Sequence, residues 1–324
     1  MILAALLVPA PGVCLAQAAP QARVTVEVRN KTAKGAAVVG EEVSLLLFRG
    51  QEQIDSRQAT AGQAGKAVFE KVPTGQDMTA IARAKHQNMA FTSLPVSLDP
   101  AAGELSATVE VYDVSTDTSK LFVGTHHIIV AVRSASLEVT EYMQLTNPSD
   151  MAITGARRDD RNQPIVIEGR LPRGFKDLAV SSYLEEEALV VGPEGFHDTM
   201  AVPPGEHHVA FSYKLDINRN TMEIAREITL PTSELMIFWQ HGQGKLEGLG
   251  EPAGRLVNAE GAPVEYYRRS DLKPGERVAF QISGFNVKQS DRYTWVILIA
   301  VFVAAAVIAL LRLRRKPAGS GRRT

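Results

Sequence analysis

The chain has 324 residues, with 35 Lys and Arg, 36 Asp and Glu, and a single cysteine. Six of the basic residues follow Leu311 and no acidic residue does, so the rest of the chain carries 29 basic against 36 acidic residues, a net charge of −7. This acidic excess argues against nucleic acid as a partner, because nucleic-acid surfaces need clustered Lys and Arg. With only Cys14, a disulfide within the chain is excluded.

Residues 1–18, MILAALLVPAPGVCLAQA, form a short apolar stretch that ends in the small-x-small pattern Ala16-Gln17-Ala18. This pattern predicts a secretory signal peptide that is cleaved after Ala18. No Lys or Arg precedes Arg23, so the basic beginning of such signals is missing, and an N-terminal anchor is the alternative. Cleavage would leave a mature chain without cysteine, which must be stable by core packing alone.

The region 22–112 alternates apolar and polar residues with a period of two, which predicts β-strands and no helix. The expected strands are centred on 24–28, 43–47, 68–69, 79–86 and 90–98. Turns rich in glycine and proline separate them. This amount of chain suits one small β-sandwich.

The order of residues in this region is a first strand, Gly40 with VSLLL, and then Thr60, Gly65, Phe69, Val72, Pro73 and Gly75. That order resembles the carboxypeptidase regulatory-like, or transthyretin-like, domain, in which a Thr and a Gly precede a strand bearing Phe and a Pro-x-Gly turn. The chain departs from the family where Asp77-Met78-Thr79 replace the usual aromatic. The resemblance implies a non-catalytic β-sandwich at the N-terminus of a single-pass bacterial envelope protein, and it implies no active-site residues.

Further strands predict a second β-sandwich over 113–231. Within it, 209–215 and 222–230 flank Asn218-Arg219-Asn220 and predict a hairpin. The stretch 232–288 predicts a small β unit that either completes the second sandwich or follows it.

The run WVILIAVFVAAAVIALL at 295–311 has 17 residues without a charge. With its neighbours it predicts a transmembrane helix over 293–313, because only a helix satisfies its own backbone in lipid. The alternative is a buried core helix. The basic tail 314–324 is expected to be cytoplasmic by the positive-inside rule. The remainder would then lie outside the cytoplasm, anchored by a single span in the cytoplasmic (inner) membrane with a periplasmic ectodomain.

The expected helix has small-x-x-x-small spacings at Ala300, Ala304, Ala305 and Ala309. Such spacing lets two helices approach closely, so a homodimer through the membrane is a further hypothesis.

Two adjacent histidine pairs, His126-His127 and His207-His208, suggest metal binding, with Glu206 as a further ligand. Neighbouring side chains of a strand point to opposite faces, however, so neither pair can chelate one ion by itself. Asp216, Asn218, Asn220 and Glu227 match part of a calcium loop that lacks its glycine. We therefore predict no metal site, and half-exposed strand histidines are the expectation.

Runs of carboxylates occur at Glu185-Glu186-Glu187 and at Asp159-Asp160. The serines considered as nucleophiles are those of Ser181-Ser182 and Ser283-Gly284. Contiguous carboxylates are typical of solvated loops, whereas acid–base catalysis needs two carboxylates across a cleft. No nucleophile elbow, phosphate loop or dinucleotide fingerprint is present, and GQGKLEGLG at 242–250 has the wrong spacing. We predict no catalytic residue, no cofactor and no enzymatic activity.

Aromatic residues at Phe238, Trp239, Tyr266 and Tyr267 either form a ligand-binding surface or fill a core. The expected fold is mainly β, with two or three β-sandwich units in tandem followed by one C-terminal transmembrane helix. The leading hypothesis for function is a non-catalytic binding or scaffolding component of the cell envelope, with an envelope protein or a surface ligand as partner. The alternatives are a carbohydrate- or peptide-binding module, and a metal-dependent hydrolase using His127 with His207 or His208.

Overall fold

The computed structural model describes residues 20–285, except for 100, 102, 134, 241–243, 259 and 260. Strands dominate this part of the chain, so the predicted mainly β class is confirmed. The predicted signal segment 1–18, transmembrane segment 293–313 and tail 314–324 lie outside the described residues. Among the residues described, no helix has the length and hydropathy needed to cross a membrane.

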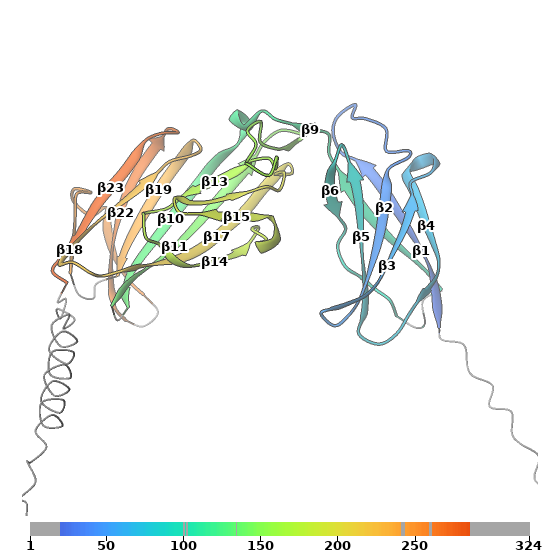
Figure 1. Ribbon diagram of the computed structural model, residues 1–324, viewed down its shortest axis with the longest axis horizontal. Helices are drawn as coiled ribbons and strands as arrows, with labels where there is room; N and C mark the ends of the chain where they lie inside the picture. Colours follow the sequence, from blue (N-terminus) through green and yellow to red (C-terminus); the bar gives the residue numbers. More distant parts are fainter. Residues whose placement is uncertain are drawn as a thin grey trace, which may run out of the picture.

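The first β unit spans residues 21–111 and consists of two sheets (Figure 1). One sheet has the order β4-β1-β8, with β1 (Gln21–Asn30), β4 (Lys66–Pro73) and β8 (Glu104–Val111). The other has the order β3-β2-β5-β6, with β2 (Glu42–Arg49), β3 (Glu52–Thr60), β5 (Met78–His86) and β6 (Met89–Thr92), while β7 (Val96–Ser97) also pairs with β5. A single 3-10 turn, η1 (Gln63–Gly65), precedes β4.

Alternation along the strands builds the core of this unit, because every second side chain points inward. Val24, Val26 and Val28 of β1 are buried in one cluster with Val43, Leu45 and Leu47 of β2. The predicted strands at 24–28, 43–47 and 79–86 are thus confirmed. Strand β3 was missed, because its sequence EQIDSRQAT is almost wholly exposed and carries no apolar alternation.

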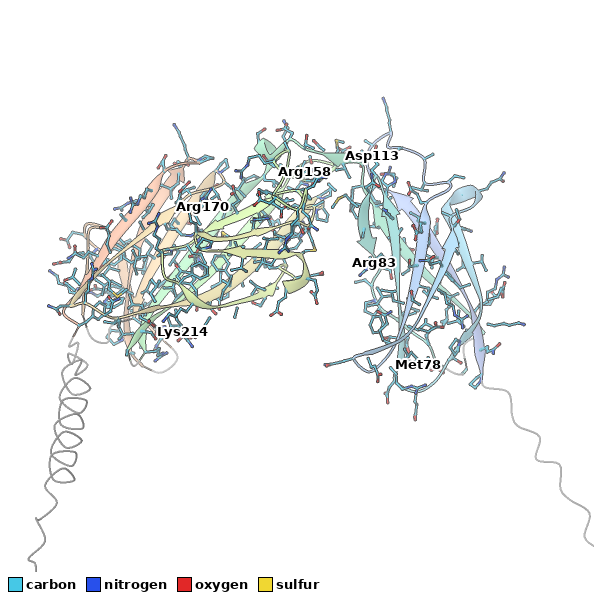
Figure 2. All side chains as sticks on the ribbon, in the orientation of Figure 1. Met78, Arg83, Asp113, Arg158, Arg170 and Lys214 are labelled. Atoms are coloured by element: carbon cyan, nitrogen blue, oxygen red, sulfur yellow. The ribbon has the colours of Figure 1, made fainter. Side chains whose placement is uncertain are left out.

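The first and last long strands of this unit run in parallel. β1 pairs with β8 in an unbroken register from Arg23↔Glu104 to Asn30↔Val111. The chain therefore enters the unit at one end and leaves it at the other, where Asn30 lies beside the exit to the next unit. Figure 2 shows Asp113 at this exit and Met78 at the opposite end.

The second β unit spans residues 114–283 and contains a seven-stranded sheet of order β14-β17-β11-β10-β19-β22-β21. Its strands are β10 (Phe122–Arg133), β11 (Ser136–Asn147), β14 (Lys176–Ser182), β17 (Gly205–Asp216), β19 (Thr232–Gln240), β21 (Gly254–Val257) and β22 (Pro263–Leu272). We refer to it as the long sheet.

Two smaller sheets provide the other layer of this unit. They are β13-β16-β15, with β13 (Ile167–Arg170), β15 (Leu189–Gly192) and β16 (Gly195–Asp198), and β18-β23-β20, with β18 (Thr221–Glu227), β20 (Lys245–Glu247) and β23 (Arg277–Ser283). A short pair of β9 (Val114–Ser115) and β12 (Ala152–Ile153) lies at the entrance, and the 3-10 turns η2 (Thr118–Lys120) and η3 (Glu186–Ala188) lie in loops.

One core joins these sheets. It contains Val130 of β10 and Phe211 of β17, together with Leu235 of β19 and Phe280 of β23. Strands from 232–283 therefore belong to the same sheets and the same core as strands from 122–227.

The predicted hairpin of 209–215 with 222–230 is wrong. β17 pairs with β11 and β14 in the long sheet, whereas β18 pairs with β23 in the opposite layer. The turn at Asn218-Arg219-Asn220 thus carries the chain from one layer to the other. Each strand has buried side chains, but they face each other across the core and do not lie in one sheet.

Candidate functional site

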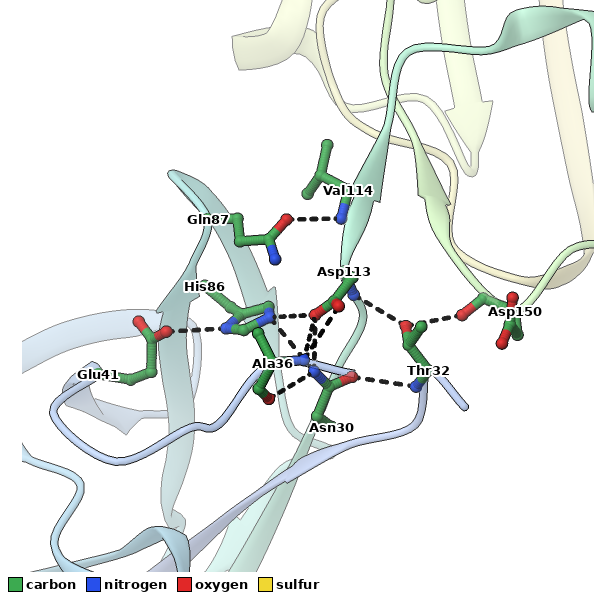
Figure 3. A network of polar contacts seen from close by, with 9 residues as sticks. All are labelled: Asn30, Thr32, Ala36, Glu41, His86, Gln87, Asp113, Val114 and Asp150. Atoms are coloured by element: carbon green, nitrogen blue, oxygen red, sulfur yellow. Dashed lines mark hydrogen bonds and ion pairs between the residues drawn. The ribbon is translucent and has the colours of Figure 1, made fainter. Parts of the chain in front are cut away.

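The junction between the two β units is a dense network of hydrogen bonds centred on Asp113 (Figure 3). Asp113 follows the end of β8 and immediately precedes β9 of the second unit. Its Oδ1 accepts hydrogen bonds from Asn30 Nδ2 at 2.7 Å and from Ala36 N at 3.2 Å, and Oδ2 accepts from Ala36 N at 3.0 Å. Its carboxylate is therefore held by two segments of the first unit.

Asn30 has a fixed orientation in this network. Its Oδ1 accepts from Thr32 N at 3.0 Å, and its Nδ2 donates to Ala36 O at 2.9 Å as well as to Asp113. A Cβ at Gly35 would lie 2.5 Å from Asn30 Nδ2, so glycine lets the loop lie against this amide. Both hydrogens of the Asn30 amide are consequently used.

His86 at the end of β5 completes the network. Only 1% of its side chain is exposed, and both ring nitrogens meet carboxylates: Nδ1 lies 2.8 Å from Glu41 Oε1, and Nε2 lies 2.8 Å from Asp113 Oδ1. Burial raises the pKa of Asp113, but the hydrogen bonds from His86, Asn30 and Ala36 outweigh it and leave that pKa below its usual value. Asp113 is thus ionised at neutral pH.

The same network reaches the second unit through the loop after β1. Thr32 Oγ1 accepts from Asp113 N at 2.9 Å and donates to Asp150 O at 2.8 Å. Ala33 N donates to Asp150 Oδ2 at 2.9 Å, and Val114 N donates to Gln87 Oε1 at 2.9 Å. The two units are therefore joined by hydrogen bonds from two segments of the first unit, the loop after β1 and the turn after β5.

A second polar cluster lies inside the second unit and contains one of the predicted histidines. His126 Nε2 and Arg226 Nε contact Glu141 Oε2 at 2.8 and 2.9 Å, and Tyr213 donates to Glu141 Oε1 at 3.2 Å. Burial acts to raise the pKa of Glu141, but the charge of Arg226 and the bond from His126 lower it to about 2. Burial lowers the pKa of His126, more than Glu141 raises it. The cluster is a neutral histidine beside a buried ion pair.

The other predicted histidines are placed elsewhere. His127 points to the face of the long sheet opposite the core and contacts Phe238 edge-on, at 5.3 Å between ring centroids. His207 contacts Pro203 O through Nε2 at 2.9 Å and packs on Tyr183, while His208 is exposed. Among the described residues, no three His, Cys, Asp or Glu side chains are placed to hold a metal ion.

The residues of the calcium-loop pattern are also separated. Asp216 pairs with Lys176 at the end of β17, and Asn218 and Asn220 are exposed in the connection to β18. Glu227 lies at the far end of β18, opposite Arg277 of β23 in the register. Seven residues of extended strand span on the order of 20 Å, too far for one ion.

The run 185–187 and Asp160 lie at the surface, whereas the side chain of Asp159 is only 9% exposed. Glu186 and Glu187 belong to the exposed turn η3. Asp159 Oδ1 accepts from the backbone of Arg161 and Gln163, and its Oδ2 lies 3.3 Å from His197 Nε2. These contacts are those of a loop closed by a carboxylate.

The four candidate aromatics divide between the two faces of the long sheet. Trp239 and Tyr267 are buried in the core, with 1% and 5% exposed. Phe238 and Tyr266 occupy the opposite, outer face, half-buried and 5.9 Å apart between ring centroids. A Cβ at Gly254 would lie 2.6 Å from the Tyr266 hydroxyl, so glycine lets that ring lie flat on β21.

These rings belong to a row that crosses four strands. Tyr142 of β11 is paired with His127 of β10, and Phe238 of β19 is paired with Tyr266 of β22. His127 and Phe238 connect the two pairs, and Tyr142 is 48% exposed. We call these four residues the outer aromatic row.

A groove of about 600 Å³ lies at the edge of the second layer. Three arginines line it, but Arg170 pairs with Glu194 and Arg277 pairs with Glu223. The charges of this groove are balanced by its own carboxylates, which makes it a poor site for an anion.

One buried carboxylate was not singled out by the sequence. Asp198, at the end of β16, is wholly buried; Oδ1 accepts from Met200 N at 3.0 Å, and Oδ2 has no hydrogen-bond partner among the described residues. Burial raises its pKa to about 6. Its position in the sequence GFHDTM carries no signal for this, because burial is decided by the sheets that fold over it.

No protein-family model and no curated protein matches this chain. Among solved structures, the chain is similar to an M1 zinc metallopeptidase variant from Deinococcus radiodurans bound to a Tyr-Ser-Ala substrate. The TM-score is 0.31 and the identity 10%, over 51% of this chain and 42% of the peptidase chain. The likeness thus spans less than half of the peptidase, and it carries no argument about function.

Proposed function

We propose that this chain is a non-catalytic, membrane-anchored β protein that acts as a binding or scaffolding component of the cell envelope. Its ectodomain would comprise β-sandwich units in tandem, the first of the carboxypeptidase regulatory-like type. The run 295–311 and the basic tail would fix it to the inner membrane, and the ectodomain would face the periplasm.

The outer aromatic row carries the proposal. A sheet face that contacts only water is expected to carry polar side chains, as β11 does at Glu138 and Thr140. The row instead places Tyr142, His127, Phe238 and Tyr266 on four consecutive strands of the sheet, in partial contact with solvent. Aromatic side chains supply large contact area at low entropic cost, which is why they are enriched at protein interfaces.

The surroundings of the row favour a protein partner over a charged ligand. Arg268, beside Met236 in the register, pairs with Glu234 on the same face. The row is therefore apolar at its centre and bordered by a compensated ion pair, which resembles the core-and-rim arrangement of interfaces. Its rings are tilted or edge-on to one another, at 82° and 36°, and a flat stacking platform for a sugar would need parallel rings.

Site-specific photocrosslinking tests the binding surface. A photoreactive phenylalanine analogue at Tyr142 in the full chain should give a discrete protein adduct in membranes, and Phe238→Ala in the same chain should abolish that adduct. The same analogue at Gln53, exposed on β3 of the first unit, is the matched control and should give none. Equal adducts from both positions would contradict the proposed surface, and retention on a glycan with no protein adduct would favour the carbohydrate-binding alternative.

The anchor is tested separately. A reporter fused after Thr324 that is active only in the cytoplasm agrees with the proposed topology. Reporter activity only outside the cytoplasm would show that the orientation is the opposite of the one proposed. Release of the chain from membranes by high salt would show that no transmembrane helix anchors it.

A further inference from the structure

We propose that His86 is a proton-dependent latch, which holds the two β units in one orientation when its ring is doubly protonated and loosens their junction when it is not. The proposal goes beyond binding at the outer aromatic row and does not depend on it. It rests on the hydrogen positions that the network around His86 requires.

The hydrogen on Nε2 is fixed by the neighbours. Both hydrogens of the Asn30 amide go to Ala36 O and Asp113 Oδ1, and Asn30 cannot be flipped because its Oδ1 accepts from Thr32 N. Asp113 Oδ1 itself only accepts. The 2.8 Å contact between His86 Nε2 and Asp113 Oδ1 therefore needs a hydrogen on Nε2.

The opposite side of the ring then lacks a hydrogen. A neutral imidazole with its hydrogen on Nε2 presents a lone pair at Nδ1, yet Nδ1 lies 2.8 Å from Glu41 Oε1. Two acceptors do not remain at that distance. The observed contact requires one more proton between Nδ1 and Glu41, which makes the pair a charge-assisted hydrogen bond.

The charged groups that contact the ring are both acidic. Glu41 comes from the loop before β2, and Asp113 follows β8; their side chains are 23% and 17% exposed. Asn30 of β1 is an uncharged neighbour, and Asp150 of the second unit lies one hydrogen bond farther, beyond Thr32. A protonated ring balances two carboxylates, whereas a neutral ring leaves two negative charges around a buried heterocycle.

Loss of the proton weakens the contacts that orient the units. Glu41 and Thr32 belong to the loop 31–41, which carries the hydrogen bonds to Asp113 and Asp150. Once Glu41 and His86 Nδ1 separate, the ring no longer ties this loop to β5. The closed junction therefore takes up a proton, and by linkage a fall in pH favours it while a rise in pH opens it.

Distances between two spin labels in the full chain measure the junction. We would place them at Gln53→Cys on β3 and Ser181→Cys on β14, both exposed positions, with Cys14→Ser to remove the native thiol. We expect one narrow distance distribution at acidic pH, near about pH 5, and a broader one at alkaline pH, near about pH 8.5. Loss of one charged hydrogen bond shifts the ratio of open to closed junctions about tenfold or more.

Glu41→Gln provides the decisive variant. The glutamine amide can donate to a neutral Nδ1 or accept from a protonated one, so it satisfies the ring in both states. We expect the narrow distribution at both pH values. His197→Gln, which removes the His197–Asp159 contact within the second unit, is the matched control and should keep the pH dependence of the unmodified chain. A distribution that does not change with pH in the unmodified chain, or an unaltered pH dependence in Glu41→Gln, would overturn the latch.

Discussion

At the scale of single residues, the two buried carboxylates of the second unit differ in how their oxygens are satisfied. Glu141 receives hydrogen bonds on both oxygens and has a buried cation beside it, so it stays ionised despite its burial. Asp198 has one satisfied oxygen and no cation in contact, and its pKa rises to about 6. Burial alone thus does not decide whether a carboxylate is charged; its partners do.

The free energy of unfolding should depend on pH through the ionisation of Asp198. The folded-state pKa of Asp198 lies above the value of 3.8 in an unfolded chain, so its contribution is present below that value and is lost as pH rises through about 6. We expect Asp198→Asn to remove this loss and to be more stable than the unmodified chain at neutral pH, by on the order of 2 kcal/mol, with no such gain at acidic pH. Urea unfolding at both pH values measures it. A gain of the same size at both would contradict the assignment.

At the scale of elements, the ion pair of Glu141 and Arg226 fastens the two layers of the second unit. Glu141 comes from β11 in the long sheet, and Arg226 comes from β18 in the opposite layer. Arg226 also donates to Arg170 O at the end of β13. One guanidinium therefore joins three sheets at a point where the core is otherwise apolar.

Removing that guanidinium should be costly. We expect Arg226→Met to lower the free energy of unfolding by about 3–5 kcal/mol, because Glu141 is left charged and buried without its cation. The double variant Arg226→Met with Glu141→Gln should recover most of the loss, since the amide oxygen still accepts from His126. Denaturant unfolding compares the two. A double variant as unstable as the single one would show that the charge is not the cause.

The tight hairpin of β15 and β16 depends on glycine at one position and not at its partner. Gly195 has φ +133°, and a Cβ there would lie 1.9 Å from Gly169 O, whereas a Cβ at Gly192 would meet nothing within 4 Å. We expect Gly195→Ala to destabilise by about 3 kcal/mol or more, and Gly192→Ala to change stability by less than about 0.5 kcal/mol. Thermal unfolding of both variants checks this, and similar losses in both would refute the steric account.

The sequence allowed the strands of the first unit that alternate apolar and polar residues to be located, because this alternation is a local signal, but it did not reveal the exposed strand β3. It also implied that Trp239 and Phe238 lie on opposite faces of their sheet, because neighbouring side chains of a strand point in opposite directions. It did not reveal that β17 and β18 lie in different layers, because two apolar strands joined by a polar turn look alike in either arrangement. The junction was missed for a similar reason: Asn30, His86 and Asp113 are 27 to 83 positions apart, and each alone is an ordinary polar residue.

At the scale of the whole molecule, the junction makes the two units depend on each other. Asp113 belongs to the linker and is bonded to the first unit through its side chain, while its carbonyl accepts from Ala152 N of the second unit at 2.9 Å. Ala152 itself packs into the core of the first unit. The two units therefore share a boundary that is partly polar and partly apolar.

Asp113→Ala should weaken this coupling. Removal of the Asp113 carboxylate leaves Asn30, His86 and Ala36 with unpaired donors in a partly buried site. We expect this to lower the free energy of unfolding of the first unit by about 2–4 kcal/mol. Calorimetry should then show the first unit melting apart from the second at a lower temperature. Glu52→Ala, at the exposed start of β3, is the control and should leave the melting profile unchanged. An unaltered profile in Asp113→Ala would argue that the apolar contacts alone hold the junction.

The parallel pairing of β1 with β8 has a mechanical consequence. Because the chain enters at the start of β1 and leaves at the end of β8, tension between the N-terminus and the second unit pulls these two strands past each other along their length. All the hydrogen bonds of the register from Arg23↔Glu104 to Asn30↔Val111 then bear the force together, and none can be peeled off first. We expect the first unit to resist stretching in this direction far better than its thermal stability alone would indicate.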